Sequence, residues 1–328
     1  QKAAFYGCFL SGYLVHLYVF TNIIPNSDGL SRIFDPQQMT VSGRWFLHFA
    51  SYFNGFTQMP AVIGLFSVLF LALAAALAVS LLGIRSRALS ALSGALMAAF
   101  PAVGYTFLYL FTASAYCFAI FLAVLSVSLA RRGRWHWLAG CLLLACSMGT
   151  YQAYVTVAIG LSLLVIFWET LDPSASFSAT LRLGVRLMLF LAAGAVLYYG
   201  ILLVFLQVKD LELLSYLGMD AASSGYPFSR LPGLLLDTYK QVAAFFFLPG
   251  SANTFTSGWM AVLDLAALAL GGGCFLLCMG QEGLWRARWR PLGGVAMLAL
   301  LPLGINFGQI LSPWPAPTPL MKYAFVLV

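Results

Sequence analysis

Charged residues are scarce in this 328-residue chain, where Asp, Glu, Lys and Arg together make up 8% of the sequence. Soluble domains carry roughly a quarter of their residues charged, so this scarcity excludes an ordinary water-soluble domain. Hydrophobic residues reach 62%, and the mean hydropathy is +0.91. Apolar runs of roughly 20 residues recur along the chain, and each can cross a hydrocarbon layer about 30 Å thick. The composition therefore predicts an all-α fold, a polytopic bundle of transmembrane helices.

Other absences narrow the class of protein further. The alternating ten-residue segments of a transmembrane β-barrel are missing, and no internal repeat or inverted pair of broken helices indicates a secondary transporter. No paired Cys/His spacing typical of zinc sites occurs. The cysteines all lie within apolar runs and therefore indicate small packing residues rather than a disulfide framework; they are Cys8, Cys117, Cys141, Cys146, Cys274 and Cys278.

The apolar runs predict about ten spans in a single transmembrane domain over residues 1–328. Their ranges are 4–24, 60–83, 88–107, 110–130, 137–150, 151–170, 184–206, 257–280 and 292–310, with another span beginning near 320. Because the last run is short, we interpret the chain as truncated within a C-terminal helix. Two long polar segments, 25–59 and 207–256, each contain an amphipathic stretch that predicts a juxtamembrane helix: "WFLHFASYFNGF" (45–56) and "LPGLLLDTYKQVAAFFF" (231–247).

The net charge of +7 comes largely from four arginine clusters that follow every second predicted helix. By the positive-inside rule these clusters face the cytoplasm, which places the N-terminus there too. The two long polar segments then lie on the extracytoplasmic face, which we predict to be the active face. We interpret the clusters as topology signals and anionic-lipid contacts, not as a nucleic-acid surface; they are Arg85 and Arg87, Arg131, Arg132 and Arg134, Arg182 and Arg186, and Arg286, Arg288 and Arg290.

The first long segment contains "NSDGLSRIFDPQQMTVSGRW" (26–45), with two acids and two arginines. Asp28 and Asp35 flank Arg32, and a carboxylate near a cation stays ionised, as a base that takes a proton from a hydroxyl must. Arg44 has the planar fork that binds a phosphate through two parallel hydrogen bonds. The alternative interpretations are a turn residue for Asp28 and an interface residue beside a tryptophan for Arg44.

Two further pairs of candidate binding residues follow later in the chain. The "GTYQAY" motif places Tyr151 and Gln152 at a turn between apolar runs, where a glutamine faces the protein interior or a wet cavity. Lys322 and Tyr323 follow the proline-rich "SPWPAPTP", and a lysine at a helix start opposes the helix dipole unless an anion lies nearby. An interhelical hydrogen bond and an interface anchor are the respective alternatives.

A second tier of candidates carries weaker signals. Asp264 lies within a predicted span, where an acid is a functional candidate by default. His16 in the first span is a candidate partner for it, although nothing in the sequence pairs the two. Asp237 and Lys240 bring charge to the second amphipathic stretch. The alternative interpretation of this stretch is an interfacial anchor without a ligand.

The order of these motifs resembles the type II glucosyltransferase family, polytopic enzymes of the GT-C class that modify bacterial O-antigen and related surface glycans. The resemblance runs from about residue 10 to the end of the chain. It is strongest in "SDGLSRIFDPQQMTVSGRW" (27–45) and "SMGTYQAYVTVAIGLSLLV" (147–165). It implies a GT-C-like fold in the bacterial inner membrane.

The resemblance also implies the substrates and the base. The donor is a polyprenyl-phosphate-linked hexose, usually glucose, and the acceptor is a glycan or glycolipid. The family's usual base, a carboxylate in the first outer loop, corresponds here to Asp28. Many relatives have paired acids at this place, whereas "SDG" offers one, so Asp35 is a possible substitute. No cofactor is expected; a divalent metal held by the two acids stays open.

These expectations combine into one predicted mechanism, an inverting displacement at the anomeric carbon of the lipid-linked sugar. Asp28 deprotonates the acceptor, while Arg44, Lys322 and Arg32 stabilise the phosphate leaving group. Tyr151 and Gln152 contact the sugar hydroxyls. Two other classes of function remain alternatives at this point. One is a sugar-lipid transporter or flippase, and the other is a non-catalytic subunit of a glycan assembly complex.

Overall fold

The described part of the chain is almost entirely helical. The computed structural model describes residues 1–24, 26, 28–29, 33–214, 228–250, 256–281, 283–311 and 318–328. Within those ranges no β-strand forms, and extended pairing is limited to two isolated bridges in the first loop. The predicted all-α fold is confirmed for these residues.

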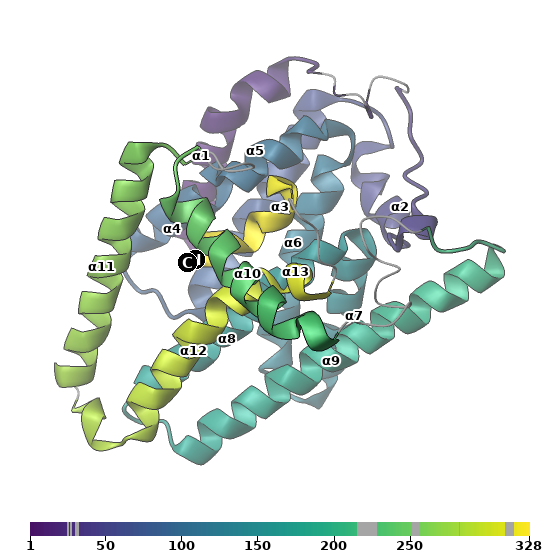
Figure 1. Ribbon diagram of the computed structural model, residues 1–328. Helices are drawn as coiled ribbons and strands as arrows, with labels where there is room; N and C mark the ends of the chain where they lie inside the picture. The colour runs from purple at the N-terminus through teal and green to yellow at the C-terminus, as the bar shows by residue number, and fades with distance from the viewer. Residues whose placement is uncertain are drawn as a thin grey trace.

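The first half of the chain supplies the centre of the bundle (Figure 1). Its helices are α1 (Lys2–Thr21), η1 (Thr40–Ser42), α2 (Leu47–Ala50), η2 (Ser51–Asn54), α3 (Pro60–Leu81), α4 (Arg87–Ala99), α5 (Pro101–Leu108) and α6 (Leu110–Ala130). α1 packs on α3 and α4, and α6 packs on α3, α7 and α8. α6 is the most enclosed span, with 78% of its apolar window buried.

The second half wraps this centre. Its helices are α7 (Arg134–Thr150), η3 (Gln152–Tyr154), α8 (Val155–Leu171), α9 (Phe177–Val208), η4 (Phe228–Arg230), α10 (Leu231–Phe247), α11 (Gly258–Gln281), η5 (Leu284–Arg286), α12 (Trp289–Ile305), α13 (Phe307–Leu311) and η6 (Pro319–Leu327). Figure 1 shows α10 crossing the front of the bundle, α9 running along its lower side and α11 at one edge. Only 6% of the α11 window is buried, so lipid is the natural surrounding of that helix.

Seven helices in the described ranges are long and apolar enough to cross a membrane, compared with about ten predicted. The predicted spans at 137–150 and 292–310 correspond to α7 and α12, which have 17 residues each. The segment near 320 forms the 3-10 helix η6 instead of an α-helix. The predicted helix 88–107 is interrupted at Phe100, because Pro101 lacks the N–H that would continue it.

Only one of the two predicted juxtamembrane helices forms over its full length. The stretch 231–247 forms α10 in full. The stretch 45–56 forms only the short helices α2 and η2, which Gly55 terminates in the left-handed conformation (φ 59°). Trp45 is buried, and Phe53 packs against the rings of Phe70 and Phe118. Part of this predicted juxtamembrane stretch is therefore folded into the bundle.

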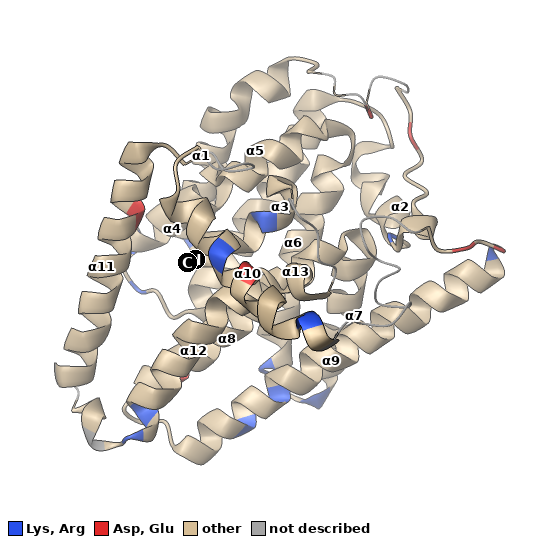
Figure 2. Ribbon diagram, in the orientation of Figure 1, with Lys and Arg blue, Asp and Glu red and all other residues tan. Residues whose placement is uncertain are grey.

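The basic connectors gather at one end of the bundle, together with the N-terminus. Gln1 donates from Nε2 to Ser80 Oγ (2.8 Å), and Arg131 donates to Leu81 O (3.3 Å). Arg186 donates from Nε to Ala130 O (2.6 Å). Figure 2 shows Lys and Arg concentrated where α9 and α12 begin. The predicted grouping of these clusters on one side agrees with this arrangement.

One member of these clusters has a purely structural role. Arg290 is buried and donates to four carbonyls of the turn between α8 and α9. The acceptors are Thr170 O (3.1 Å), Asp172 O (2.5 Å), Pro173 O (3.1 Å) and Ala175 O (2.7 Å). Arg290 thereby joins the start of α12 to that turn. Its charge-assisted hydrogen bonds also satisfy carbonyls that would otherwise be left without donors.

Close packing of α1 on α4 depends on two glycines. A Cβ placed on Gly94 would overlap the backbone carbonyl of Ala4, and one on Gly7 would overlap the carbonyl of Ala91. Small residues let transmembrane helices approach to backbone contact. α1 leads directly into the first loop, so this crossing also sets where that loop begins.

We expect Gly94→Ala to destabilise the protein by about 1–3 kcal/mol, because the added methyl group meets backbone atoms that cannot rotate away. Thermal unfolding in detergent, compared with the wild type, measures the loss. Gly104→Ala is the matched control, since no atom lies within 4 Å of a Cβ there and alanine favours helix. Equal stabilities for the two variants would contradict the close helix crossing.

Candidate functional site

The two motifs that carry the family resemblance, more than 100 residues apart, meet at the end of the bundle opposite the basic connectors. The Phe46 N–H donates to Gly149 O (2.7 Å). The indole of Trp45 lies on Gly149, where a Cβ would come within 2.6 Å of the ring. Gly149 therefore fits this position because any larger residue would displace the tryptophan. The "SGRW" loop is seated on the end of α7 by this contact.

Two polar side chains fasten the loop to the neighbouring helices. Gln152 donates from Nε2 to Ser42 O (2.8 Å) and to Tyr198 Oη (3.1 Å). Tyr198 in turn donates to Gly43 O (3.1 Å). Gly43 has a left-handed φ of 77°, which glycine adopts without strain. These bonds fix the backbone turn that directs the next residue, Arg44, into the protein.

Arg44 is half-buried and lies among tyrosines. Its Nη1 donates to Tyr116 Oη (3.0 Å), and its guanidinium carbon lies 4.9 Å from the centre of the Tyr151 ring. A cation over an aromatic face is stabilised by the ring quadrupole. The tyrosine surface therefore holds the guanidinium of Arg44 in a defined position.

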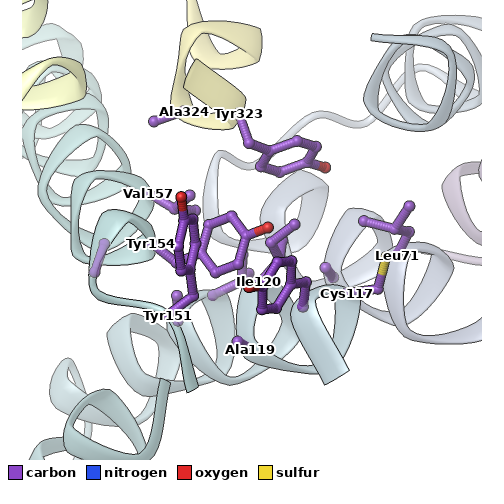
Figure 3. Packing of buried hydrophobic residues seen from close by; sticks show 14 of the residues in the cluster. Leu71, Cys117, Ala119, Ile120, Tyr151, Tyr154, Val157, Tyr323 and Ala324 are labelled. Atoms are coloured by element: carbon purple, nitrogen blue, oxygen red, sulfur yellow. The ribbon is translucent and has the colours of Figure 1, made fainter. Parts of the chain in front are cut away.

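A cluster of four tyrosines begins at this arginine and continues toward η6. Tyr116 stacks on Tyr151 (ring centres 4.8 Å), Tyr151 meets Tyr154 edge-on (5.2 Å), and Tyr154 lies edge-on to Tyr323 (6.5 Å). Figure 3 shows Tyr151, Tyr154 and Tyr323 around one interior region, beside Ile120 of α6. Tyr323 donates to Met97 O (3.3 Å), which ties η6 to α4.

Lys322, next to Tyr323, is a second buried cation. Its side chain is 5% exposed, and its Nζ lies 5.6 Å from the centre of the Phe245 ring. No described carboxylate lies within ion-pair distance. η6 lies outside the candidate membrane spans, and desolvation by burial lowers the pKa of Lys322. An ammonium group in such surroundings is suited to an anionic ligand, which would offset the cost of burial.

The predicted acids lie in the first loop, apart from this cluster of contacts. Asp28 is exposed in a turn where the Gly29 N–H donates to Asn26 Oδ1 (2.7 Å) and Gln58 donates to Gly29 O (2.6 Å). Asp35 accepts from the Gln37 N–H (2.9 Å), a local turn bond. Arg32 lies outside the described residues, so its predicted position between the acids stays a prediction.

A family model described as glucosyl transferase GtrII matches residues 17–326. The chain belongs to this family. No curated protein and no solved structure matches this chain. The predicted resemblance to type II glucosyltransferases is therefore confirmed, and membership of the GtrII family indicates a membrane glycosyltransferase that acts on surface glycans.

The second-tier residues do not join the tyrosine cluster of this GtrII-family protein. His16 is buried, with its Nε2 2.9 Å from Ala98 O and its ring against Phe107. These contacts indicate a structural packing role for this histidine. Asp264 is half-buried on α11, and no contact with His16 is present among the described residues. Asp237 and Lys240 form an exposed ion pair on α10 (3.4 Å). Exposed pairs of this kind contribute little stability.

Three residues of this candidate site escaped the sequence interpretation: Tyr116, Tyr154 and Tyr198. Each lies in an apolar run, where it was counted as part of a span. For Tyr116 and Tyr198 the available signal was the hydroxyl group, because a buried tyrosine generally finds a hydrogen-bond partner. Among the described residues no group of three or more His, Cys, Asp and Glu side chains gathers. A divalent ion at Asp28 and Asp35 would therefore need further ligands.

Proposed function

We propose that this GtrII-family protein transfers glucose from a polyprenyl-phosphate donor to a surface glycan or glycolipid on the extracytoplasmic face of a bacterial inner membrane, by inverting displacement. The observation that carries the proposal is the meeting of "SGRW" with "TYQAY". It presents the guanidinium of Arg44 on a tyrosine surface formed by Tyr116 and Tyr151. A phosphate diester is the chemical partner that such an arginine fits.

In the proposed step the acceptor hydroxyl attacks the anomeric carbon of the donor sugar. Its proton passes to the carboxylate of Asp28, and the bond between the anomeric carbon and the phosphate oxygen breaks. The polyprenyl phosphate leaves with the bonding electron pair, so negative charge grows on its oxygen. Arg44 and Lys322 stabilise that charge, and Arg32 is proposed to assist them. Asp35 is the reserve base.

The tyrosines and Gln152 have distinct proposed roles. The amide nitrogen of Gln152 donates to Ser42 O and Tyr198 Oη, so we assign this residue to positioning the loop in addition to its predicted sugar contact. Tyr151 supports the guanidinium of Arg44 with its ring. Tyr323, adjacent to Lys322, is proposed to line the same donor cavity.

The proposed orientation is supported by the separation of charge along the bundle. The basic connectors and the N-terminus share one end, which the positive-inside rule assigns to the cytoplasm. The start of the second long segment meets the first at the other end, because the Leu214 N–H donates to Val41 O (2.9 Å). A GT-C-like arrangement, with its donor site at the outer surface, is consistent with this geometry.

A donor test distinguishes the proposal from its alternatives. The purified chain in lipid nanodiscs is supplied with labelled glucose, either on polyprenyl phosphate or on a nucleotide, together with surface-glycan acceptor from a bacterial membrane. We expect acceptor-dependent transfer from the lipid-linked donor alone. Transfer from the nucleotide sugar would refute the proposed donor. Movement of the sugar-lipid across proteoliposomes without transfer would favour a flippase instead.

A further inference from the structure

An open groove lies between α7 and α9 at the basic end of the bundle, away from the tyrosine cluster. Its volume is about 680 Å³, and three arginines and several large apolar side chains surround it. The arginines are Arg134 at the start of α7 and Arg182 and Arg186 on the first turns of α9. The groove is therefore lined by both cationic and apolar side chains.

The apolar wall is a regular ridge on α9. Leu181, Val185 and Leu189 follow one another at intervals of four residues, which places them on one face of the helix. They are 54%, 43% and 54% exposed. Arg182 and Arg186 lie beside this ridge with the same spacing. A molecule that fills the groove thus meets arginine side chains beside an apolar ridge, and the ridge continues along α9 to Leu189.

The floor of the groove is rigid. Trp137 donates from its indole Nε1 to Arg186 O (3.3 Å). Arg186 donates to Ala130 O (2.6 Å), Arg132 O and Gly133 O (3.4 Å), so its guanidinium closes the turn between α6 and α7. These bonds hold α7 and α9 at a fixed separation. A ligand would therefore bind to a preformed shape.

Arg134 and Arg182 keep binding capacity for a ligand. Arg134 contacts the ring of Trp135, with its guanidinium carbon 5.5 Å from the ring centre. Arg182 donates from Nε to Ser178 O (3.2 Å) within its own helix, and no bond from its terminal nitrogens is present among the described residues. No described acid forms an ion pair with either arginine.

We propose that this groove is a specific binding site for an anionic phospholipid of the phosphatidylglycerol class. Arg134 and Arg182 bind the phosphate through charge-assisted hydrogen bonds, and an acyl chain lies along Leu181, Val185 and Leu189. The charge and apolar pattern of the groove match those of one lipid molecule at the membrane surface. A nucleic acid or a soluble anion would leave the apolar ridge without a partner.

This site is separate from the proposed donor site. Arg134 begins α7, whereas Gly149, on which the "SGRW" loop rests, lies one residue before its end at Thr150. Seventeen residues of α-helix span about 25 Å, so one phosphate group cannot contact both sites. The proposal depends on the membrane embedding of the chain and not on its catalytic step.

The test uses the full chain in detergent and measures thermal stability with added phosphatidylglycerol or phosphatidylcholine, because a ligand that binds the folded state raises the midpoint. We expect stabilisation by phosphatidylglycerol alone. Arg134→Gln with Arg182→Gln should weaken the apparent affinity roughly 25-fold, about fivefold for each arginine near the membrane surface. Arg85→Gln with Arg87→Gln removes the same charge from another basic connector and should leave the affinity unchanged.

A third variant tests the apolar wall. Val185→Trp fills the groove at a partly exposed position while every arginine stays, and it should reduce phosphatidylglycerol binding at least tenfold. Unchanged affinity in this variant or in the Arg134/Arg182 pair would overturn the proposal. Equal weakening in the Arg85/Arg87 pair would also overturn it, since attraction would then be general. The same midpoint shift from glycerol phosphate would show that the headgroup alone binds and would refute the lipid site.

Discussion

Asp28→Asn is expected to lower glucose transfer from the lipid-linked donor by about 10²–10⁴-fold, the usual contribution of a general base. The asparagine keeps the shape and the turn preference of the residue, but its amide cannot take the proton of the acceptor. Asp28 is exposed, so we expect a change in unfolding free energy within about 0.5 kcal/mol. Initial rates at saturating donor, with the midpoint of thermal unfolding measured in parallel, provide the comparison.

Two controls accompany this variant. Asp210→Asn removes an exposed acid from the second outer segment; its φ of 50° suits asparagine equally well, and transfer should be unaffected. Asp35→Asn tests the reserve base, whose carboxylate accepts from the Gln37 N–H. If Asp28→Asn retains near wild-type transfer while Asp35→Asn abolishes it, the base has been assigned to the wrong acid. Near wild-type transfer in both variants would exclude a carboxylate base in this loop.

The second large effect is expected at Lys322. Lys322→Met keeps a long unbranched side chain but removes the ammonium group, and transfer should fall about 10²–10³-fold, as when one donor to a developing oxyanion is lost. Lys209→Met is the matched control. Lys209 also lies over a phenylalanine ring, Phe205 at 5.7 Å, but it is exposed and should be dispensable. Equal activity of the two variants would exclude Lys322 from phosphate binding.

The same substitution should not weaken the fold, which separates a functional role from a structural one. Burial lowers the pKa of Lys322, so holding the charged form in the protein costs stability at any pH below the folded-state pKa. That cost fades as the pH rises through the folded pKa toward the ordinary value of about 10.4. Methionine removes it, so Lys322→Met should unfold at an equal or higher temperature near neutral pH. This advantage should vanish above about pH 10.4.

If Lys322→Met loses transfer activity but gains stability, the buried ammonium group serves ligand binding at a cost in folding free energy. A buried cation whose ammonium group lies against the Phe245 ring contributes little to folding. Polyprenyl phosphate should then raise the unfolding temperature of the wild type and leave that of Lys322→Met unchanged. A lower unfolding temperature for the ligand-free variant would assign the lysine to structure instead.

Much of the fold followed from the sequence because its signals are local. Apolar runs of 20–24 residues predicted α1, α3, α6 and α11 closely, since a helix in hydrocarbon must satisfy its own backbone. The arginine clusters predicted which connectors share an end. The number of spans did not follow, because α7 and α12 are 17 residues long and the last segment winds as a 3-10 helix.

The sequence predicted only part of the candidate site. "SGRW" and "TYQAY" were predicted to be functional motifs, yet nothing in the sequence indicated that Phe46 bonds Gly149 or that Arg44 bonds Tyr116. Tyr116 and Tyr198 were hidden because a tyrosine in an apolar run has the same local pattern as a packing residue. Which face of α6 or α9 points inward depends on neighbours that lie far away in the chain.

The sequence by itself determined the helical membrane class, the basic connectors and the GtrII-family motifs, because composition, length and short patterns are local properties of a chain. Only the tertiary structure decided which side chains surround the two cations of the candidate site. Arg44 and Lys322 are separated by 278 positions, but the tyrosines of α6, η3 and η6 link their surroundings. Burial and charge pairing arise between distant segments, so they exist only once the helices have packed.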